Sequence, residues 1–507
     1  MNMKRNLLFY LYFCVFFVLM SCSECLQDEL VIEKEIKKEN VLSQTESYMI
    51  RFSEILSKAA TDDSDLRSFL KAEALSMVNN DYDIFYPYSK SKIVSNGKSF
   101  RDILISYAKN EEELLSIEQS LPLLTIYVPE LPSGFDANSW DSENEIPYVV
   151  SNLLRNDSVD FYYDGTPAFS LKSYEIPGCA TLVIKNNERI RLKDKSTTSV
   201  GLRSSSSDYE YEFIDEAFNG QSTLMRSVTL PTGLFPQTVT QAFNEMGINN
   251  NYWQRDYIYY GLTKQSGNTG FGYLNRRFSE AIRYIKFTPD AYYKMSDQSN
   301  DPKWKLYLEQ SANPNPNVGN LLWTEGRFEI RIDVFVNNLT GFGSSLTKYF
   351  SVSPQEIFDI QYTTYKTAFF YNYIPTDITS KQYAVNIDLI TWDLESNSFG
   401  WKFLISEVDD QTTETYTTTV NAEYATNFGL TASGIIGKIG LNFGVSAKKS
   451  QTNNYTMVTN KGSDDLGSIE FSFSDPVLVN YNANQMFTLF SKSNPYVEMI
   501  LCPRQIY

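Results

Sequence analysis

The spacing of apolar residues along this chain changes at Pro122. Between residues 30 and 120, apolar side chains recur every three to four positions, which is the period of an amphipathic helix. From residue 123 onward, short apolar runs and alternating apolar and polar residues take over, and this pattern is typical of strands. The change predicts an α+β fold, with an N-terminal helical or α+β region followed by one or more mainly antiparallel, sandwich-like β domains.

Individual helices can be placed in the first part of the chain. The apolar face of residues 48–59 predicts one helix. Asp62-Asp63-Ser64-Asp65 offers an N-cap and favourable negative charge to a second helix, whose apolar stripe runs over residues 66–77. Two shorter helices are predicted over residues 99–108 and 110–120.

Several strands can be placed in the same way. Residues 123–128 predict one strand, and two short strands are expected within residues 181–192, around Asn186-Asn187. In residues 327–336 apolar and charged residues alternate strictly, which predicts a half-buried strand with its charged face in water. Ser353-Pro354-Gln355-Glu356 is a capping box with proline at the first helical position, and it predicts a short helix.

The chain of 507 residues is long enough for two or three domains with cores of their own. The serine run at residues 204–207 and the Asn-Pro repeat at residues 313–317 are the best candidates for breaks. The predicted organisation is a signal peptide (1–21), a lipidated tether (22–44), an N-terminal α+β domain (45–195), a Ser-rich linker (196–208), a mixed middle region (209–318) and a C-terminal mainly β domain (319–507).

The N-terminus has the pattern of an exported protein. Lys4 and Arg5 precede an apolar run over residues 7–20, which has the length of a signal-peptide core and is too short to span a bilayer. Leu19-Met20-Ser21-Cys22 then resembles a bacterial lipobox. The resemblance implies cleavage before Cys22, a diacylglycerol on its thiol and fatty acids such as palmitate as the anchor. We therefore expect a protein of the bacterial cell envelope, lipid-anchored in the outer membrane and exposed at the surface.

Cysteine usage gives little further constraint. If Cys14 leaves with the signal and Cys22 carries lipid, then Cys25, Cys179 and Cys502 remain. Three thiols allow at most one disulfide, for example between Cys179 and Cys502, and buried or free thiols are the commoner outcome.

Charge and composition exclude several classes of function. The net charge is −17, from 44 basic and 61 acidic residues, so nucleic acid is not an expected partner. Histidine is absent, which excludes Ser-His-Asp and Cys-His catalysis as well as His-ligated zinc and haem. The Ser68-Phe69-Leu70-Lys71 match to S-x-x-K lies within an apolar stripe and has no companion motif, so we interpret it as chance. We predict no cofactor and no metal, and we interpret the acidic segments around Asp160 and Glu407 as solvated loops.

The most unusual segment spans residues 412–459. Two long alternating stretches, 416–430 and 438–448, flank an apolar, glycine-rich tip at Gly434-Ile435-Ile436-Gly437. With its Thr- and Asn-rich flanks, the segment resembles the membrane-inserting hairpins of aerolysin-like pore-forming proteins, and this would leave Ile435 and Ile436 exposed for contact with a membrane or a partner. A long hairpin packed on a soluble sheet produces the same alternation, and that alternative stays open.

Three functions are compatible with these features. The first is a lipid-anchored envelope protein that binds an extracellular glycan or protein without catalysis, through an aromatic surface on the β region. The second is a pore-forming or membrane-inserting β protein that uses the hairpin 412–459. The third is a glycoside hydrolase that works with carboxylates alone, because a pair of acidic residues can cleave glycosides without histidine.

Overall fold

The structure is a computed structural model. It describes residues 43–153, 158–193, 209–220, 237–248, 252–265, 271–295, 322–324, 326–339, 344–367, 370–408, 413–425, 428–430, 436–439, 448–460, 463–481 and 487–506. The predicted signal peptide, residues 22–42 of the predicted tether (including Cys22) and the Ser-rich linker at 196–208 lie outside these residues. Residues 49–507 form one compact unit. The domain boundaries within it stay predictions.

The helices predicted from the apolar stripes are present. They are α2 (Gln44–Asp62), α3 (Ser64–Leu75), α5 (Phe100–Ile105) and α6 (Glu111–Ser120), with the single turn α4 (Tyr86–Ser89) between them. The side chain of Asp63 caps α3 by accepting a hydrogen bond from the backbone N–H of Leu66 at 3.1 Å. No helix among the described residues is long and apolar enough to cross a membrane.

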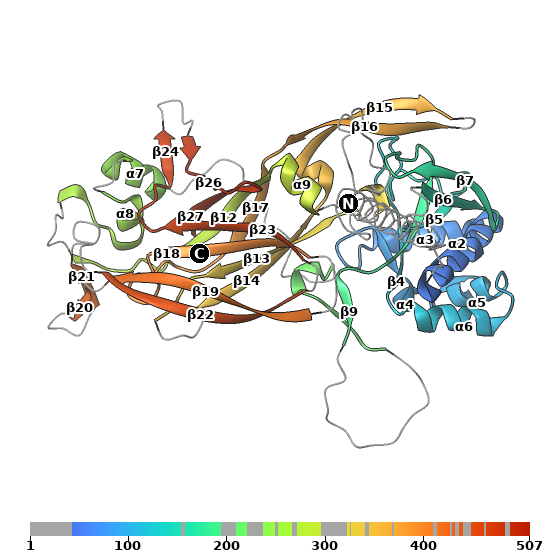
Figure 1. Cartoon of the computed structure of the whole chain (residues 1–507), viewed down its shortest axis with the longest axis horizontal. Coiled ribbons are helices and arrows are strands. Elements are labelled where there is room, and N and C mark those ends of the chain that lie inside the picture. The colour runs from blue at the N-terminus through green and yellow to red at the C-terminus, as the bar shows by residue number, and fades with distance from the viewer. Residues whose placement is uncertain are drawn as a thin grey trace, which may run out of the picture. The chain divides into compact units, whose positions relative to one another are not determined.

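A six-stranded sheet accompanies these helices (Figure 1). Its order is β1-β4-β8-β5-β6-β7, and all neighbours are antiparallel except β5 and β8. The strands are β1 (Asp83–Phe85), β4 (Leu124–Tyr127), β5 (Tyr148–Ser151), β6 (Ser158–Tyr163), β7 (Thr166–Lys172) and β8 (Thr181–Asn186). The second short strand expected within 181–192 is β9 (Ile190–Leu192), and it pairs with β10 (Tyr211–Phe213).

Two four-stranded antiparallel sheets dominate the C-terminal half, which confirms the predicted α+β class. The first has the order β17-β12-β27-β26 and contains β12 (Phe278–Phe287), β17 (Tyr383–Asp388), β26 (Lys492–Ser493) and β27 (Val497–Gln505). The second has the order β14-β13-β18-β23 and contains β13 (Phe328–Phe335), β14 (Ser345–Val352), β18 (Gly400–Glu407) and β23 (Asp464–Ser472). Strand β23 contacts β26 and β27, and Trp392 stacks on Trp401 of β18 at 4.2 Å between ring centroids.

Shorter elements complete the described chain. The helices are α7 (Gln237–Met246), α8 (Gln254–Tyr260), α9 (Pro289–Met295) and the turn α10 (Pro354–Ile357), with 3₁₀ turns η1 (Glu216–Phe218) and η5 (Leu322–Thr324). The predicted capping box begins α10, since Ser353 and Glu356 cap one another. The short strands are β2 (Ile93–Ser95), β3 (Lys98–Ser99), β11 (Phe271–Gly272), β24 (Leu478–Tyr481) and β25 (Phe487–Leu489).

The prediction that residues 327–336 form a half-buried strand was wrong in one respect. Strand β13 is present, but both of its faces are buried. Its charged row is Glu329, Arg331 and Asp333, and each of these side chains is at most 5% exposed. The row has partners instead of water: Arg331 pairs with Asp333 at 3.0 Å, and Tyr416 donates a hydrogen bond to Asp333 at 3.2 Å. Alternation predicts the strand, but it does not distinguish a solvated charged face from one buried in ion pairs.

The hairpin 412–459 differs in register from the prediction. Strands β19 (Thr413–Ala425) and β22 (Lys448–Asn460) pair over their full length without a bulge. Closer to the turn, β20 (Phe428–Leu430) pairs with β21 (Ile436–Ile439), so Ile436 lies opposite Leu430. Ile435 lies outside the described residues.

One face of this hairpin packs against the body of the protein. Val420, Ala422 and Tyr424 are buried, and Tyr455 donates a hydrogen bond to the side-chain oxygen of Asn337 at 2.7 Å. The described part of the apolar row is therefore arranged as in a hairpin packed on a sheet, which is the alternative that the sequence analysis left open.

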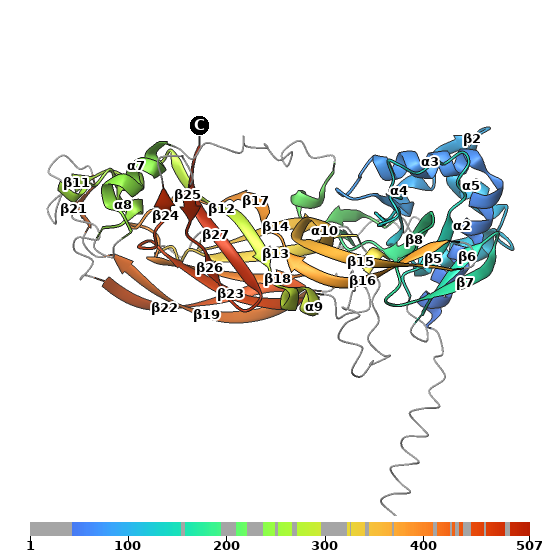
Figure 2. The same ribbon diagram turned by 90° about the horizontal axis from the view of Figure 1, so that it is seen from above.

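A second hairpin forms an arm of β15 (Phe358–Lys366) and β16 (Tyr371–Ser380). Figure 2 shows it reaching from the C-terminal sheets toward β6 and β7. Ile176 and Tyr373 exchange backbone hydrogen bonds at 2.9 and 3.1 Å, and Phe370 packs against Phe169 at 4.8 Å between ring centroids. The arm thereby attaches the N-terminal α+β region to the β region.

Candidate functional site

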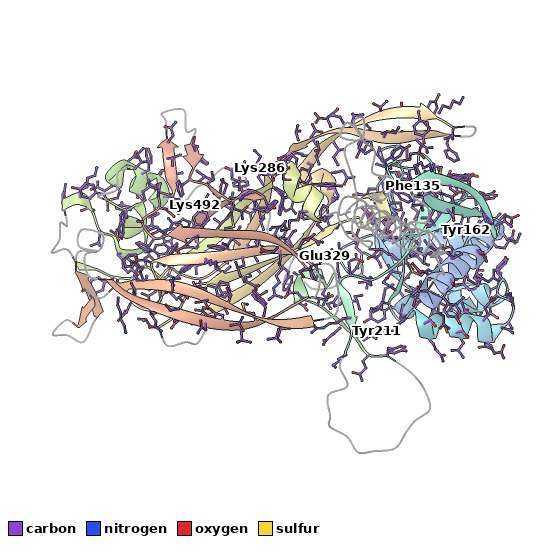
Figure 3. The ribbon with its side chains drawn as sticks, viewed as in Figure 1. Phe135, Tyr162, Tyr211, Lys286, Glu329 and Lys492 are labelled. Carbon is purple, nitrogen blue, oxygen red and sulfur yellow. The ribbon has the colours of Figure 1, made fainter. Side chains whose placement is uncertain are left out.

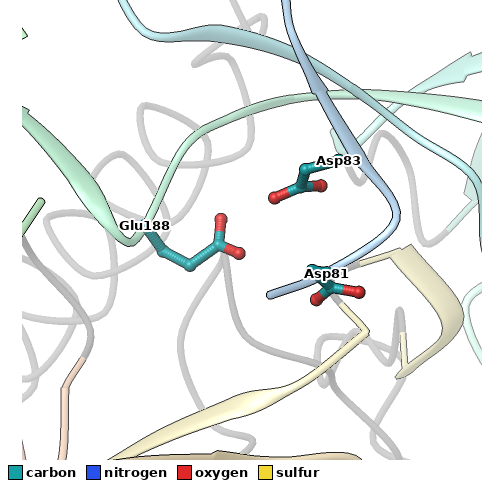
Figure 4. Close-up of side chains that lie close together, drawn as sticks. All are labelled: Asp81, Asp83 and Glu188. Atoms are coloured by element: carbon teal, nitrogen blue, oxygen red, sulfur yellow. The ribbon is translucent and has the colours of Figure 1, made fainter. Parts of the chain in front are cut away.

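Three carboxylates converge between β1, β8 and the turn that follows β8 (Figure 4). Asp83 begins β1, Asp81 lies two residues before it, and Glu188 comes from the turn before β9. An oxygen from each lies within 4.8 Å of the others. Asp83 is fully buried, and Asp81 is 5% exposed.

Two basic side chains occupy the same cluster. Lys185 Nζ lies 2.6 Å from Glu188 Oε1 and 3.4 Å from Asp83 Oδ1. Arg189 pairs with Asp81 at 3.0 Å and with Glu329 at 2.6 Å. Glu329, labelled in Figure 3, belongs to β13, so this ion network joins the N-terminal region to the central strand of a C-terminal sheet.

Burial changes the acid strength of this network. Removal from water raises the pKa of Asp83 to about 7, although the neighbouring Lys185 opposes the change. Burial also raises the pKa values of Glu188 and Glu329, against the attraction of Lys185 and Arg189 respectively. For Arg189, burial alone would lower the pKa, but Glu329 and Asp81 outweigh it and the pKa rises above its ordinary value.

The cluster is better suited to a structural role, as a buried ion network, than to metal binding. Ca²⁺ and Mg²⁺ prefer several carboxylate and carbonyl oxygens around a single cation. Here the ammonium of Lys185 and the guanidinium of Arg189 already hold the inner carboxylate oxygens, so a metal ion would meet two positive charges. We therefore interpret these residues as a structural ion network that joins the N-terminal α+β region to the C-terminal β region.

A second candidate is a groove on the outer face of β12 and β27. It has a volume of about 300 Å³, which is at the lower end of the range for small-ligand sites. A β-bulge between Ile282 and Tyr284 interrupts the pairing of β12 with both neighbours at this place, and bulges commonly reorient side chains beside binding sites. The lining residues are Tyr284, Ile285, Lys286, Ser380, Gln382, Glu498 and Ile500.

The groove combines one aromatic ring with several polar groups. Tyr284 lies beneath the guanidinium of Arg283, at 5.5 Å from the ring centroid. Glu498 accepts a hydrogen bond from the hydroxyl of Ser491 at 2.6 Å, which fixes the carboxylate. Lys286, labelled in Figure 3, adds an ammonium group. A tyrosine face with donors and acceptors around it suits a polar ligand with an apolar face, such as a sugar.

The residues singled out in the sequence have separate outcomes. Cys22 and Ile435 lie outside the described residues. Ile436 lies on β21 and is not among the residues that line the groove. Lys71 donates hydrogen bonds to the backbone carbonyls of Asn138 and Trp140, and Ser68 contacts Ser142, so each has a structural partner of its own.

Other sequence interpretations are also resolved. Asp160 lies on β6 and accepts a hydrogen bond from Ser170, and Glu407 lies on β18 and is 2% exposed. The interpretation of these two residues as parts of solvated loops was therefore wrong. Cys179 and Cys502 are free thiols and are not paired with each other. Burial raises the pKa of Cys179 to about 12 and also raises that of Cys502, so neither is activated as a thiolate.

The groove was not predicted from the sequence. Tyr284 and Glu498 lie far apart in the chain, and each sits in a strand whose sequence pattern indicates only sheet formation. The bulge between Ile282 and Tyr284 has no glycine or proline to mark it.

Comparisons of this chain with protein-family models, with curated proteins and with solved structures find no match. The site is therefore interpreted from its own geometry.

Proposed function

We propose that this chain is a lipid-anchored protein of the bacterial cell envelope that binds an extracellular ligand without catalysis. Cys22 carries the anchor in the outer membrane, and the folded body faces the outside. The ligand is a glycan or a protein, and the groove on β12 and β27 is the binding site. The observation that carries the binding site is the groove itself, because it places Tyr284 beside Lys286 and Glu498 in a recess of about 300 Å³.

The composition of the groove favours a glycan and favours binding over hydrolysis. A single sugar ring can lie on the face of the Tyr284 ring opposite Arg283, while Ser380, Gln382 and Glu498 bond to hydroxyl groups. Glycosidases that retain or invert configuration use a pair of carboxylates across the scissile bond. The residues that line this groove include one carboxylate, Glu498.

Replacing Tyr284 with alanine is expected to weaken glycan binding about tenfold or more, because aromatic anchors dominate such contacts. Binding can be measured on a glycan array and then by titration, with the full chain carrying Cys22→Ser to keep it soluble. Tyr273→Ala is the matched control, because Tyr273 is 58% exposed and is not among the groove residues. Equal glycan affinity for Tyr284→Ala and Tyr273→Ala would show that the groove is not the binding site. Shortened glycans detected by mass spectrometry would show that the protein is a hydrolase and not only a binding protein.

A further inference from the structure

The β19–β22 hairpin exposes a polar ladder on its outer face. The outward side chains pair directly across the two strands, as Thr417 with Thr456, Thr419 with Asn454 and Asn421 with Thr452. Two of these pairs are hydrogen-bonded: Thr419 donates to Asn454 at 2.9 Å, and Thr452 donates to Asn421 at 2.9 Å. All the outward residues named here are exposed.

Strand β22 is the free edge of this two-stranded sheet. Its only partner among the described strands is β19, and Figure 1 shows it below β19 in that view. On the other strand, the carbonyl of Glu423 already accepts a hydrogen bond from the backbone N–H of Phe399. The edge at β22 therefore offers a row of backbone donors and acceptors to another strand.

Most of the usual protections of an edge strand are missing from β22. Proteins discourage pairing at an edge with proline, bulges, charges or very short strands. Strand β22 is 13 residues long, contains no proline and pairs with β19 without a bulge. Its charges are Lys448 and Lys449 at one end, and residues 450–460 are uncharged.

The sequence of β22 fits a second copy of itself in antiparallel orientation. Full overlap of residues 448–460 puts Asn454 opposite Asn454 of the other copy and Thr452 opposite Thr456. This register keeps the exposed face of one strand continuous with the exposed face of the other, as a single sheet requires. It also keeps the two pairs of lysines at opposite ends of the strand pair.

Charge favours a second copy at this edge. A chain with a net charge of −17 repels its own copies over most of its surface. Strand β22 has no acidic residue, so two copies can approach here without carboxylates facing one another. We propose that two copies of this chain associate by antiparallel pairing of their β22 edges, which forms a continuous four-stranded sheet β19-β22-β22-β19.

The affinity of such a dimer is modest, because one strand pair buries less surface than a standard protein interface. Anchoring of the copies in one membrane would raise their effective concentration and favour the dimer. This inference does not depend on the groove or on the identity of its ligand.

The first test uses sedimentation equilibrium of the full chain with Cys22→Ser. We expect concentration-dependent dimerisation, weakened about tenfold or more by Thr452→Lys with Thr456→Lys, because these positions face each other across the dimer and like charges then oppose directly. The matched control is Thr417→Lys with Asn421→Lys, which adds the same charge to the same exposed face on the inner strand. Dimerisation unchanged by the β22 lysines, weakened equally by the control, or absent up to about 100 μM would overturn the proposal.

A second test does not depend on added charge. In a background with Cys22→Ser and Cys25→Ser, Asn454→Cys is expected to form a disulfide-linked dimer on mild oxidation, because facing residues of paired strands lie within disulfide reach. Thr419→Cys lies one strand further in and should not form a disulfide-linked dimer, because residue 419 of the other copy lies roughly three strand spacings away, about 14 Å. Cross-linking at Thr419 that equals cross-linking at Asn454 would reject the pairing.

Discussion

Replacing Arg189 with methionine is expected to lower the free energy of unfolding by about 3–5 kcal/mol. The Arg189 side chain is fully buried, and it donates hydrogen bonds to Glu329 at 2.6 Å, to Asp81 at 3.0 Å and to the carbonyl of Asn79 at 2.9 Å. Methionine fills similar volume but leaves two buried carboxylates without this positive partner. Urea denaturation followed by tryptophan fluorescence measures the loss.

Arg191→Met is the matched control for this prediction. Arg191 lies two residues further along the chain and pairs with Glu212 at 2.8 Å, but the side chains of both are more than a third exposed. Solvent screens such a pair, so its loss should cost less than about 1 kcal/mol. The double variant Arg189→Met with Glu329→Met should recover part of the stability, because the second substitution removes one of the two buried carboxylates that Arg189→Met leaves without a positive partner. Similar losses for Arg189→Met and Arg191→Met would contradict a central role for the buried network.

Replacing Gly178 with alanine is expected to detach the β15–β16 arm from the N-terminal region. A Cβ at residue 178 would overlap the backbone carbonyl oxygen of Tyr371 and press on the ring of Tyr373. The backbone of Tyr371 cannot rotate aside as a flexible side chain can, so the arm must move. Its movement breaks the two backbone hydrogen bonds between Ile176 and Tyr373. We expect a loss of about 1–3 kcal/mol in the free energy of unfolding.

Limited trypsin digestion at Lys366 is the local measurement for Gly178→Ala. Lys366 ends β15 and is exposed, so its cleavage reports opening of the arm before global unfolding. Cleavage should be several-fold faster in Gly178→Ala than in the wild type. Gly97→Ala is the control, since it introduces strain at a φ of +75° but has open space around the new methyl group. Equal cleavage rates in all three proteins would show that the arm is not held at Gly178.

The helices could be predicted because their signals are local. The stripe of α2 and the cap of α3 lie within a few residues of the structures that they specify. The same holds for the capping box at Ser353, which fixes the start of α10 without any distant contact.

The burial of β13 could not be predicted, because its reason is distant in sequence. Glu329 is buried against Arg189, and these residues are 140 positions apart. Asp333 is covered by Tyr416, from a hairpin 83 positions away. Alternation describes one strand at a time, whereas the environment of each face depends on which distant element packs there.

The hairpin and the groove show the same limit. Alternation predicts that residues 412–459 return on themselves, but it does not fix the register, so the long partner of β19 is residues 448–460 and not 438–448. The groove depends on a bulge in β12 and on the pairing of β12 with β27. Neither feature has a residue pattern of its own, so Tyr284 and Glu498 could be brought together only by the fold.

Anchoring through Cys22 can be tested directly by detergent phase separation of the full chain made in a Gram-negative bacterium. We predict that the wild type enters the detergent phase and that mass spectrometry finds a diacylglycerol and fatty acids on an N-terminal Cys22. Cys22→Ser should remain in the aqueous phase, with its folded body intact by circular dichroism. A wild type that stays aqueous, or a Cys22→Ser protein that still enters the detergent phase, would contradict a lipid-anchored binding protein.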